Sequence, residues 1–243
     1  MQQNARTFYQ GEAGEAYHEI KRAIPSVALP WIAQTRGEKI EPFISPDQSI
    51  MEYGIGYGWN LARLQNREKT GYDVTEKLRE AVEALGIRFV TSTTAIPEKS
   101  YDVVLCHHML EHAIDPAAEL GEMHRLLKDG GKLLLFVPYE KEGRYRVFNR
   151  EEPNHHLFSW NPQTLGNLVE VCGFELRQAE VKQFGYERFA AKKAIQLNLG
   201  QAGYRWIHRV AHLFKPAKEV FLAATKKAPA KSAQPSNADE KRK

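Results

Sequence analysis

Short apolar segments alternate with helix-length segments between residues 49 and 226, and this alternation limits the folds open to the chain more than any other feature. Seven segments are predicted as strands: residues 49–53, 70–74, 87–90, 101–106, 132–138, 174–181 and 219–226. Strands separated by helices form βαβ units, in which consecutive strands run parallel. The sequence therefore predicts an α/β fold with a doubly wound sheet.

Three of the intervening helices carry end signals. They are expected to begin at Thr75, Asp115 and Asn161 and to end near Gly86, Gly130 and Gly173. Short polar side chains accept hydrogen bonds from the first turn of a helix, and Pro116 and Pro162 fit that turn as well. Leu78, Val82 and Leu85 share one face of the first helix and predict its buried side.

Three segments flank or interrupt this pattern. Residues 1–48 predict an N-terminal helical extension, residues 183–218 a helical insertion before the last strand, and residues 227–243 a disordered basic tail. The insertion is expected to form helices over residues 186–199 and 204–214. It could act as a lid over a substrate pocket, as a helix packed on the core, or as a membrane-surface helix that gives peripheral membrane contact. We favour the lid over the membrane helix because few cations accompany the apolar stripe.

Composition narrows the class of protein. Hydrophobic residues make up 42% and charged residues 26% of 243 residues, which is typical of a globular protein. The N-terminus lacks the pattern of a signal peptide, so we expect a cytoplasmic location. Residues 226–243 carry six Lys or Arg against two acids, which leaves 28 charges of each sign in residues 1–225. This neutral core argues against nucleic acid as the partner. Cys106 and Cys172 are interpreted as buried small hydrophobes.

A glycine-rich turn follows the first predicted strand. Gly54, Gly56 and Gly58 would let the backbone turn tightly and approach a ligand. Asp73 ends the next strand, where a carboxylate is placed to accept hydrogen bonds from ribose hydroxyls. Glycines at a strand end can also form a plain turn, and Asp73 can simply cap the following helix.

Four sequence segments, taken in their order along the chain, resemble those of a known family. They are residues 52–58 (EYGIGYG), 71–73 (GYD), 101–112 (YDVVLCHHMLEH) and 126–132 (LLKDGGK). Together they resemble the class I S-adenosylmethionine-dependent methyltransferases, in particular the branch that acts on small molecules. The resemblance implies a Rossmann-like sheet of seven strands whose last strand is antiparallel, and S-adenosyl-L-methionine as the cofactor.

The resemblance also implies a set of cofactor-binding residues. Glu52 and the turn from Gly54 through Gly56 to Gly58 would hold the methionine end, and Asp73 with Val74 the ribose. His107 would lie beside the cofactor after the fourth strand. One departure concerns adenine: many relatives carry an acid after the third strand, where this chain has residues 91–94 (TSTT).

Histidines supply the candidates for catalysis. A hydroxyl acceptor must lose a proton, and imidazole is a natural general base at neutral pH. His155 and His156 precede a helix on the ligand-binding side of the sheet and are the preferred candidates, with a surface pair as the alternative. His112 is a second candidate, although we favour a structural role. His108 to His112 matches the zinc motif H-x-x-E-H, but the segment is too short for the helix that motif needs, so no metal is expected.

The sequence thus predicts a methyltransferase that acts on a small-molecule, lipid or glycan-precursor acceptor, with O-methylation favoured. Two alternatives remain: a noncatalytic module that kept the cofactor fold, and an RNA methyltransferase that uses the basic tail. Neither the acceptor nor an oligomeric state follows from the pattern.

Overall fold

The computed structural model describes residues 24–140, 146–150, 154–214 and 217–228. Residues 1–23 of the predicted N-terminal extension and residues 229–243 of the basic tail therefore lie outside the described residues. Among the described residues, no helix is both long and apolar enough to span a bilayer.

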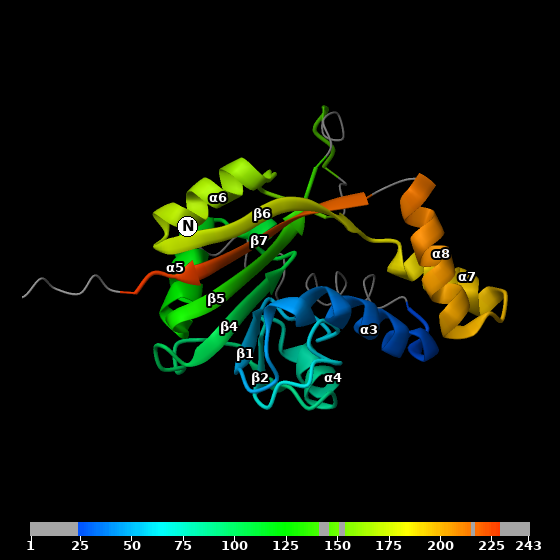
Figure 1. Cartoon of the computed structure of the whole chain (residues 1–243), viewed down its shortest axis with the longest axis horizontal. Helices are drawn as coiled ribbons and strands as arrows, with labels where there is room; N and C mark the ends of the chain where they lie inside the picture. The colour runs from blue at the N-terminus through cyan, green and yellow to red at the C-terminus, as the bar shows by residue number, and fades with distance from the viewer. Residues whose placement is uncertain (1–23, 141–145, 151–153, 215–216, 229–243) are drawn as a thin grey trace, which may run out of the picture.

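One mixed sheet organises the described chain (Figure 1). Its strands are β1 (Ile50–Tyr53), β2 (Lys69–Tyr72), β3 (Arg88–Val90), β4 (Tyr101–His107), β5 (Leu127–Pro138), β6 (Phe174–Phe184) and β7 (Ala217–Lys226). They lie in the order β3-β2-β1-β4-β5-β7-β6. The first five strands pair in parallel, and β7 is antiparallel to both β5 and β6. The expected seven-stranded Rossmann-like sheet with an antiparallel last strand is confirmed.

The chain reverses its direction of winding between β1 and β4. From β1 it continues outward to β2 and β3, then returns to place β4 on the other side of β1. At such a point the loops after two neighbouring strands leave in opposite directions and open a crevice at the carboxyl ends of the strands. A ligand site is therefore expected after Tyr53 and His107.

Helices cover both faces of the sheet (Figure 1). α5 (Pro116–Leu126) and α6 (Pro162–Val171) lie on one face, and α3 (Leu29–Ile40) and α4 (Arg79–Glu83) on the other. Side chains of a strand alternate between faces, so Leu133 and Leu135 of β5 join the cluster with α5 and α6, whereas Leu134 and Phe136 join the opposite cluster. Burial on both faces explains why residues 133–137 of β5 are apolar throughout.

The helix ends show where the local signals were sufficient. Asp115 accepts a hydrogen bond from the Ala118 amide at 3.0 Å, and Asn161 forms a capping box with Thr164, as predicted. The predicted cap at Thr75 is wrong, because its side chain makes no capping hydrogen bond. The chain there begins with the 3₁₀ turn Glu76–Leu78 before the short α4.

Two further expectations about helices need correction. Leu85 does not complete the buried stripe of α4 but is 37% exposed. The helix expected to reach Gly130 ends at Leu126, because Leu127 already pairs with Tyr101 of β4. Pairing with a neighbouring strand here overrides the local helical pattern.

The insertion between β6 and β7 contains α7 (Glu187–Gln196) and α8 (Gly200–Phe214), in agreement with the two predicted helices. Both pack beside α3 in a third apolar cluster (Figure 1). Its buried members are Ala28, Ile32, Ala190, Ala191, Ala194, Tyr204 and Ile207. On its outer side α8 leaves Trp206, Leu213 and Phe214 exposed, at 64%, 78% and 85%.

The two cysteines differ in environment. Cys106 is fully buried in β4, as expected. Cys172 is partly exposed at the end of α6, so the expectation of full burial is wrong for it. Burial raises the pKa of both thiols.

Candidate active site

A cavity of about 360 Å³ opens at the carboxyl ends of β1, β2 and β4. Its walls come from α3, the end of β1 and the turn after it, the residues after β2, the end of β4 and the segment after it, the start of α5, the end of β6 and the start of α7. The lining includes Arg36, Glu52, Gly54, Gly56, Tyr57, Trp59, Asn60, Asp73, Val74, His107, His108, Met109, His112, Phe184 and Arg188. The cavity thus lies where the reversal of winding places it.

The three glycines after β1 have different roles. All three have positive φ, which glycine adopts without strain. A Cβ on Gly56 would meet nothing within 4 Å, so Gly56 faces open cavity space. A Cβ on Gly54 would lie 2.6 Å from Cγ of Met109, which explains the glycine by close packing. Gly58 does not line the cavity and packs near Leu85 and Ile87.

Asp73 joins the glycine turn to the end of β2. Its Oδ2 accepts a hydrogen bond from the Gly56 amide at 3.0 Å, and its Oδ1 accepts one from the Thr75 amide at 3.1 Å. A carboxylate offers about four acceptor positions, so both oxygens retain capacity toward the cavity. The two interpretations of Asp73, ligand contact and local cap, are therefore compatible.

Glu52 is the most unusual ionisable group in the cavity wall. Its side chain is fully buried, and Asn60 donates a hydrogen bond to Oε1. Among the described residues, neither Oε2 of Glu52 nor Oδ1 of Asn60 has a hydrogen-bond partner. Burial raises the pKa of Glu52 to about 8, although Asn60 and the charge of Arg36 act in the opposite direction. Two unsatisfied acceptors beside a cavity fit a ligand that brings hydrogen-bond donors or positive charge.

Three imidazoles face the same cavity. His107, His108 and His112 all line it. His107 is the last residue of β4, and His108 follows it directly. His107 and His108 stack with ring centroids 4.5 Å apart. Burial first, and the charge of Lys39 second, hold the pKa of His107 well below its ordinary value. His107 therefore lies in the cavity wall, where its contact with the cofactor stays a prediction, and the structure adds His108, which sequence reasoning did not select.

The preferred histidines of the sequence analysis lie further out. His155 is exposed, and neither it nor His156 lines the cavity. His156 stands behind His112, with ring centroids 5.0 Å apart, and its Nδ1 lies 2.8 Å from Oε1 of Glu140. Of the three candidate catalytic residues, only His112 is in position to touch a ligand in this cavity.

The H-x-x-E-H segment divides between two clusters. Leu110–His112 forms a single 3₁₀ turn, so the segment lacks the helix that would place His108 and His112 on one face. The ligand atoms of Glu111, His112 and His156 nevertheless lie within 4.8 Å of one another, as do those of His107, His108 and Glu219. Spacing in the sequence could not reveal either group.

Aromatic and basic side chains complete the cavity. Tyr57 and Trp59 stack with ring centroids 5.6 Å apart. Phe184 at the end of β6, Arg188 of α7 and Arg36 of α3 also line the cavity. Sequence reasoning missed Arg36, Asn60 and Phe184, because none belongs to a motif. Residues 91–94, the departure near adenine, do not line the cavity.

Comparison with known proteins places this geometry in context. A family model described as a methyltransferase domain matches residues 19–179. A protein of Mycolicibacterium smegmatis, named as an S-adenosylmethionine-dependent methyltransferase, is 30% identical over 131 residues, which cover 51% of this chain and 49% of that protein. A ubiquinone biosynthesis O-methyltransferase of Xanthomonas oryzae is 32% identical over 99 residues, which cover 35% of this chain and 41% of that protein. The chain thus spans half or less of these two relatives.

A solved structure shares the fold. Phosphoethanolamine N-methyltransferase 2 of Haemonchus contortus, in complex with S-adenosyl-L-methionine, aligns with a TM-score of 0.57 and 16% identity. The alignment covers 80% of this chain and 53% of that chain.

Proposed function

The chain belongs to the methyltransferase domain family and is an S-adenosylmethionine-dependent methyltransferase, and on this premise we propose that it methylates a hydroxyl oxygen of a small-molecule acceptor. The observation that carries the proposal is one cavity whose lining includes both the carboxyl groups of Glu52 and Asp73 and the imidazoles of His107, His108 and His112. The carboxyl groups have the chemistry to hold the cofactor, and an imidazole has the chemistry to accept a proton.

The residues of the cavity fit the cofactor. Glu52 and Asn60 offer buried oxygens without partners, which suits the ammonium of the methionine end. Arg36, whose charge acts on Glu52, suits the carboxylate of the same end. Gly56 leaves open space beside Asp73, where the ribose hydroxyls would find acceptors. When bound, the cofactor supplies an electrophilic methyl group on a sulfonium.

The acceptor side suits a hydroxyl. In-line methyl transfer depends mainly on alignment, and a hydroxyl nucleophile also needs a base. The imidazole of His108 lies beside the aromatic ring of Phe184, with ring centroids 4.3 Å apart, and Arg188 adds a basic side chain to the cavity wall. The O-methyltransferase name of the Xanthomonas oryzae relative supports the same assignment. We propose that the insertion acts as a lid on this side, with Phe184 and Arg188 as its contacts.

The other acceptor classes have less support. Charges of the two signs are equal in number over residues 1–225, which speaks against the electrostatic affinity that an RNA methyltransferase needs. The exposed Trp206, Leu213 and Phe214 of α8 are compatible with a lipid-linked acceptor. Liposome flotation tests that class, since most of the protein would then move to the lipid fraction.

A methylation assay tests the proposal. The purified chain is incubated with cofactor labelled in the methyl group and with a small-molecule extract, and labelled products are separated and identified by mass spectrometry. We expect a product heavier by one methyl group at oxygen. Calorimetric binding of the cofactor without transfer to any small molecule would contradict small-molecule O-methylation and favour a noncatalytic role.

A further inference from the structure

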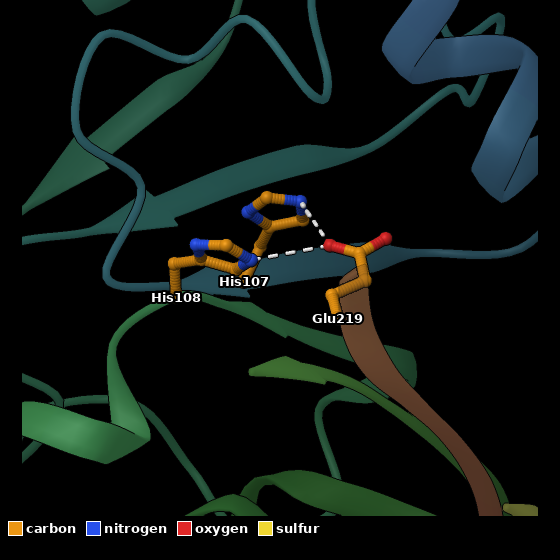
Figure 2. A group of neighbouring side chains, drawn as sticks. All are labelled: His107, His108 and Glu219. Atoms are coloured by element: carbon orange, nitrogen blue, oxygen red, sulfur yellow. Dashed lines mark hydrogen bonds and ion pairs between the residues drawn. The ribbon is translucent and has the colours of Figure 1, made fainter. Parts of the chain in front are cut away.

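Four ionisable side chains form a linked group beside the part of the cavity that the imidazoles line: Lys39, His107, His108 and Glu219. Glu219 of β7 is fully buried, and its Oε1 lies 2.7 Å from Nζ of Lys39 in α3. Its Oε2 lies 3.1 Å from Nε2 of His108. Lys39 also lies 2.9 Å from Nε2 of His107. Figure 2 shows both imidazoles on the same side of the Glu219 carboxylate.

The direction of strand β7 creates this group. β7 is antiparallel to β5, so its first residues lie beside the carboxyl end of β5, with Glu219 opposite Pro138. The His108 amide donates a hydrogen bond to the Phe136 carbonyl at the same edge. A carboxylate from near the end of the chain is thereby fixed next to the cavity after β4.

A metal ion is the first alternative for such a cluster. The ligand atoms of His107, His108 and Glu219 are close enough to one another for a metal ion. The ammonium of Lys39, however, lies within hydrogen-bond distance of both Glu219 and His107. A divalent cation there would have to displace that ammonium against the repulsion of like charges.

The hydrogen bonds instead define one tautomer of His108. Burial alone would raise the pKa of Glu219, but the charge of Lys39 and the hydrogen bond with His108 outweigh it and place the pKa below its ordinary value. Glu219 is therefore a carboxylate, which only accepts hydrogen bonds, so Nε2 of His108 carries a proton. Burial lowers the pKa of His108 despite the neighbouring carboxylate. The ring is then neutral at pH 7, and its Nδ1 has a free lone pair.

The surroundings of His108 direct this imidazole to a ligand. Its side chain is 20% exposed and lines the cavity, where its ring lies 4.3 Å from that of Phe184. Its backbone has φ of 54°, which is strained for a residue with a side chain. Strain of this kind persists where the surrounding structure enforces it, and it is concentrated at functional sites.

We propose that His108 is the general base of the reaction, held in its reactive tautomer by Glu219, which Lys39 keeps ionised. The inference rests on the proposed hydroxyl acceptor. As the acceptor oxygen bonds to the methyl carbon and the carbon–sulfur bond breaks, the hydroxyl proton passes to Nδ1 of His108. The imidazolium then returns that proton to water. His108 is the catalytic residue, and Glu219 and Lys39 are positioning residues.

This base also indicates a class of acceptor. Proton transfer is most effective when the acidities of donor and base are close. The pKa of imidazole is closer to that of a phenol or enol, about 10, than to the pKa of an aliphatic alcohol. The aromatic side chains of Tyr57, Trp59 and Phe184 along the cavity suit a planar ring. The structure therefore points to an acidic hydroxyl on an aromatic or similarly conjugated acceptor.

Kinetics of three variants test the role of His108. We expect His108→Asn, whose asparagine tolerates positive φ, to lower kcat roughly 10²- to 10⁴-fold with cofactor affinity within a few-fold. Added imidazole should restore part of that rate. Glu219→Gln should lower kcat and move the acid limb of the pH profile to lower pH, because the lost carboxylate no longer stabilises the imidazolium. The groups that face His108 in this titration are Glu219, His107, Lys39 and Arg36.

His112→Asn is the matched comparison, since His112 also lines the cavity. If it loses the rate and His108→Asn keeps it, His112 is the base and the inference is wrong. A loss of wild-type activity in a metal chelator would likewise overturn it. If the wild type transfers methyl to no hydroxyl at all, the proposed function fails instead.

A second readout does not depend on turnover. Nitrogen NMR of the histidine rings in the free wild-type protein should show His108 protonated at Nε2 at pH 7, with the signal assigned by its loss in His108→Asn. Glu219→Gln should disturb this signal, while an exposed-site control, Glu175→Gln, should not. A wild-type His108 protonated at Nδ1 would exclude it as the base.

Discussion

Replacement of Glu52 by glutamine separates its charge from its shape. Glutamine keeps an oxygen that can accept the Asn60 hydrogen bond, so the local structure should survive. What changes is the titration, because burial raises the pKa of Glu52 to about 8. If the ammonium of S-adenosylmethionine binds beside Glu52, binding requires the ionised carboxylate. Most of the free protein at pH 6.5 must then release a proton when it binds the cofactor.

The expected size of the effect follows from this pKa. Between pH 6 and 7 the wild-type affinity should rise by about tenfold, because that unit raises the ionised fraction of Glu52 about tenfold, and between pH 7 and 8 it should rise by about fivefold. Near pH 8 the rise should level off. There the lost charged hydrogen bond in Glu52→Gln is worth roughly 1.5 to 3 kcal/mol, or about 10- to 150-fold in Kd. At pH 6.5 ionising Glu52 costs the wild type about 2 kcal/mol, so the two proteins should bind almost equally.

Titration calorimetry in buffers of different ionisation enthalpy measures the released protons directly. Close to one proton should leave per cofactor bound to the wild type at pH 6.5, and almost none for Glu52→Gln. Tight wild-type binding with no proton release and no dependence on pH would refute the assignment of Glu52 as the ammonium ligand.

The stability of the free protein provides a companion measurement. The pKa of Glu52 in the folded state, about 8, is above its ordinary value of 4.5. Between pH 4.5 and 8 the folded state therefore binds more protons than the unfolded state. The contribution of Glu52 is fully present below pH 4.5 and is lost as pH rises through 8, a difference of roughly 5 kcal/mol in all. Denaturant unfolding from pH 5 to 8.5 should show this loss in the wild type and not in Glu52→Gln. Equal pH dependence in both would mean that burial does not shift this carboxyl.

Three further predictions address the cavity and the fold. Gly56→Val should weaken cofactor binding more than tenfold by calorimetry. The control is Gly86→Val, because Gly86 also has positive φ and no neighbour within 4 Å of an added Cβ but lies outside the cavity, so this change should lower only stability. Equal loss of affinity in both variants would point to general unfolding. Asp115→Ala should lower the free energy of unfolding by about 0.5 to 2 kcal/mol through the lost cap of α5, and an unchanged value would show that the cap is not needed. Phe184→Ala should raise the KM for the acceptor several-fold and leave the cofactor Kd within a few-fold, and the reverse pattern would place Phe184 on the cofactor side.

Local rules predicted most of the sheet and two of the helix starts. Strand segments were identified because burial on both faces leaves a continuous apolar run, as in β4 and β5. Asp115 and Asn161 were identified because a cap and the following proline act within one helical turn. Leu127 was misassigned because pairing with the neighbouring strand β4 determines its conformation. Thr75 was misassigned because the chain there begins with a 3₁₀ turn that the threonine side chain does not cap.

The sequence by itself also determined which residues of the proposed cofactor site lie close together. Glu52, Gly56 and Asp73 lie within or directly after consecutive strands, and parallel strands bring their carboxyl ends to one edge. Their proximity therefore follows from the strand pattern alone.

The acceptor side was decided only by the tertiary structure. Glu219 is 111 residues from His108, and it reaches that histidine because β7 inserts antiparallel between β5 and β6. Lys39 belongs to α3, which precedes β1 in the chain, and no spacing rule links it to Glu219 or to His108. His155 and His156, by contrast, are adjacent to a ligand-side loop in sequence but are held outside the cavity. Which polar groups meet in space depends on strand order and packing, and neither is a local property of the chain.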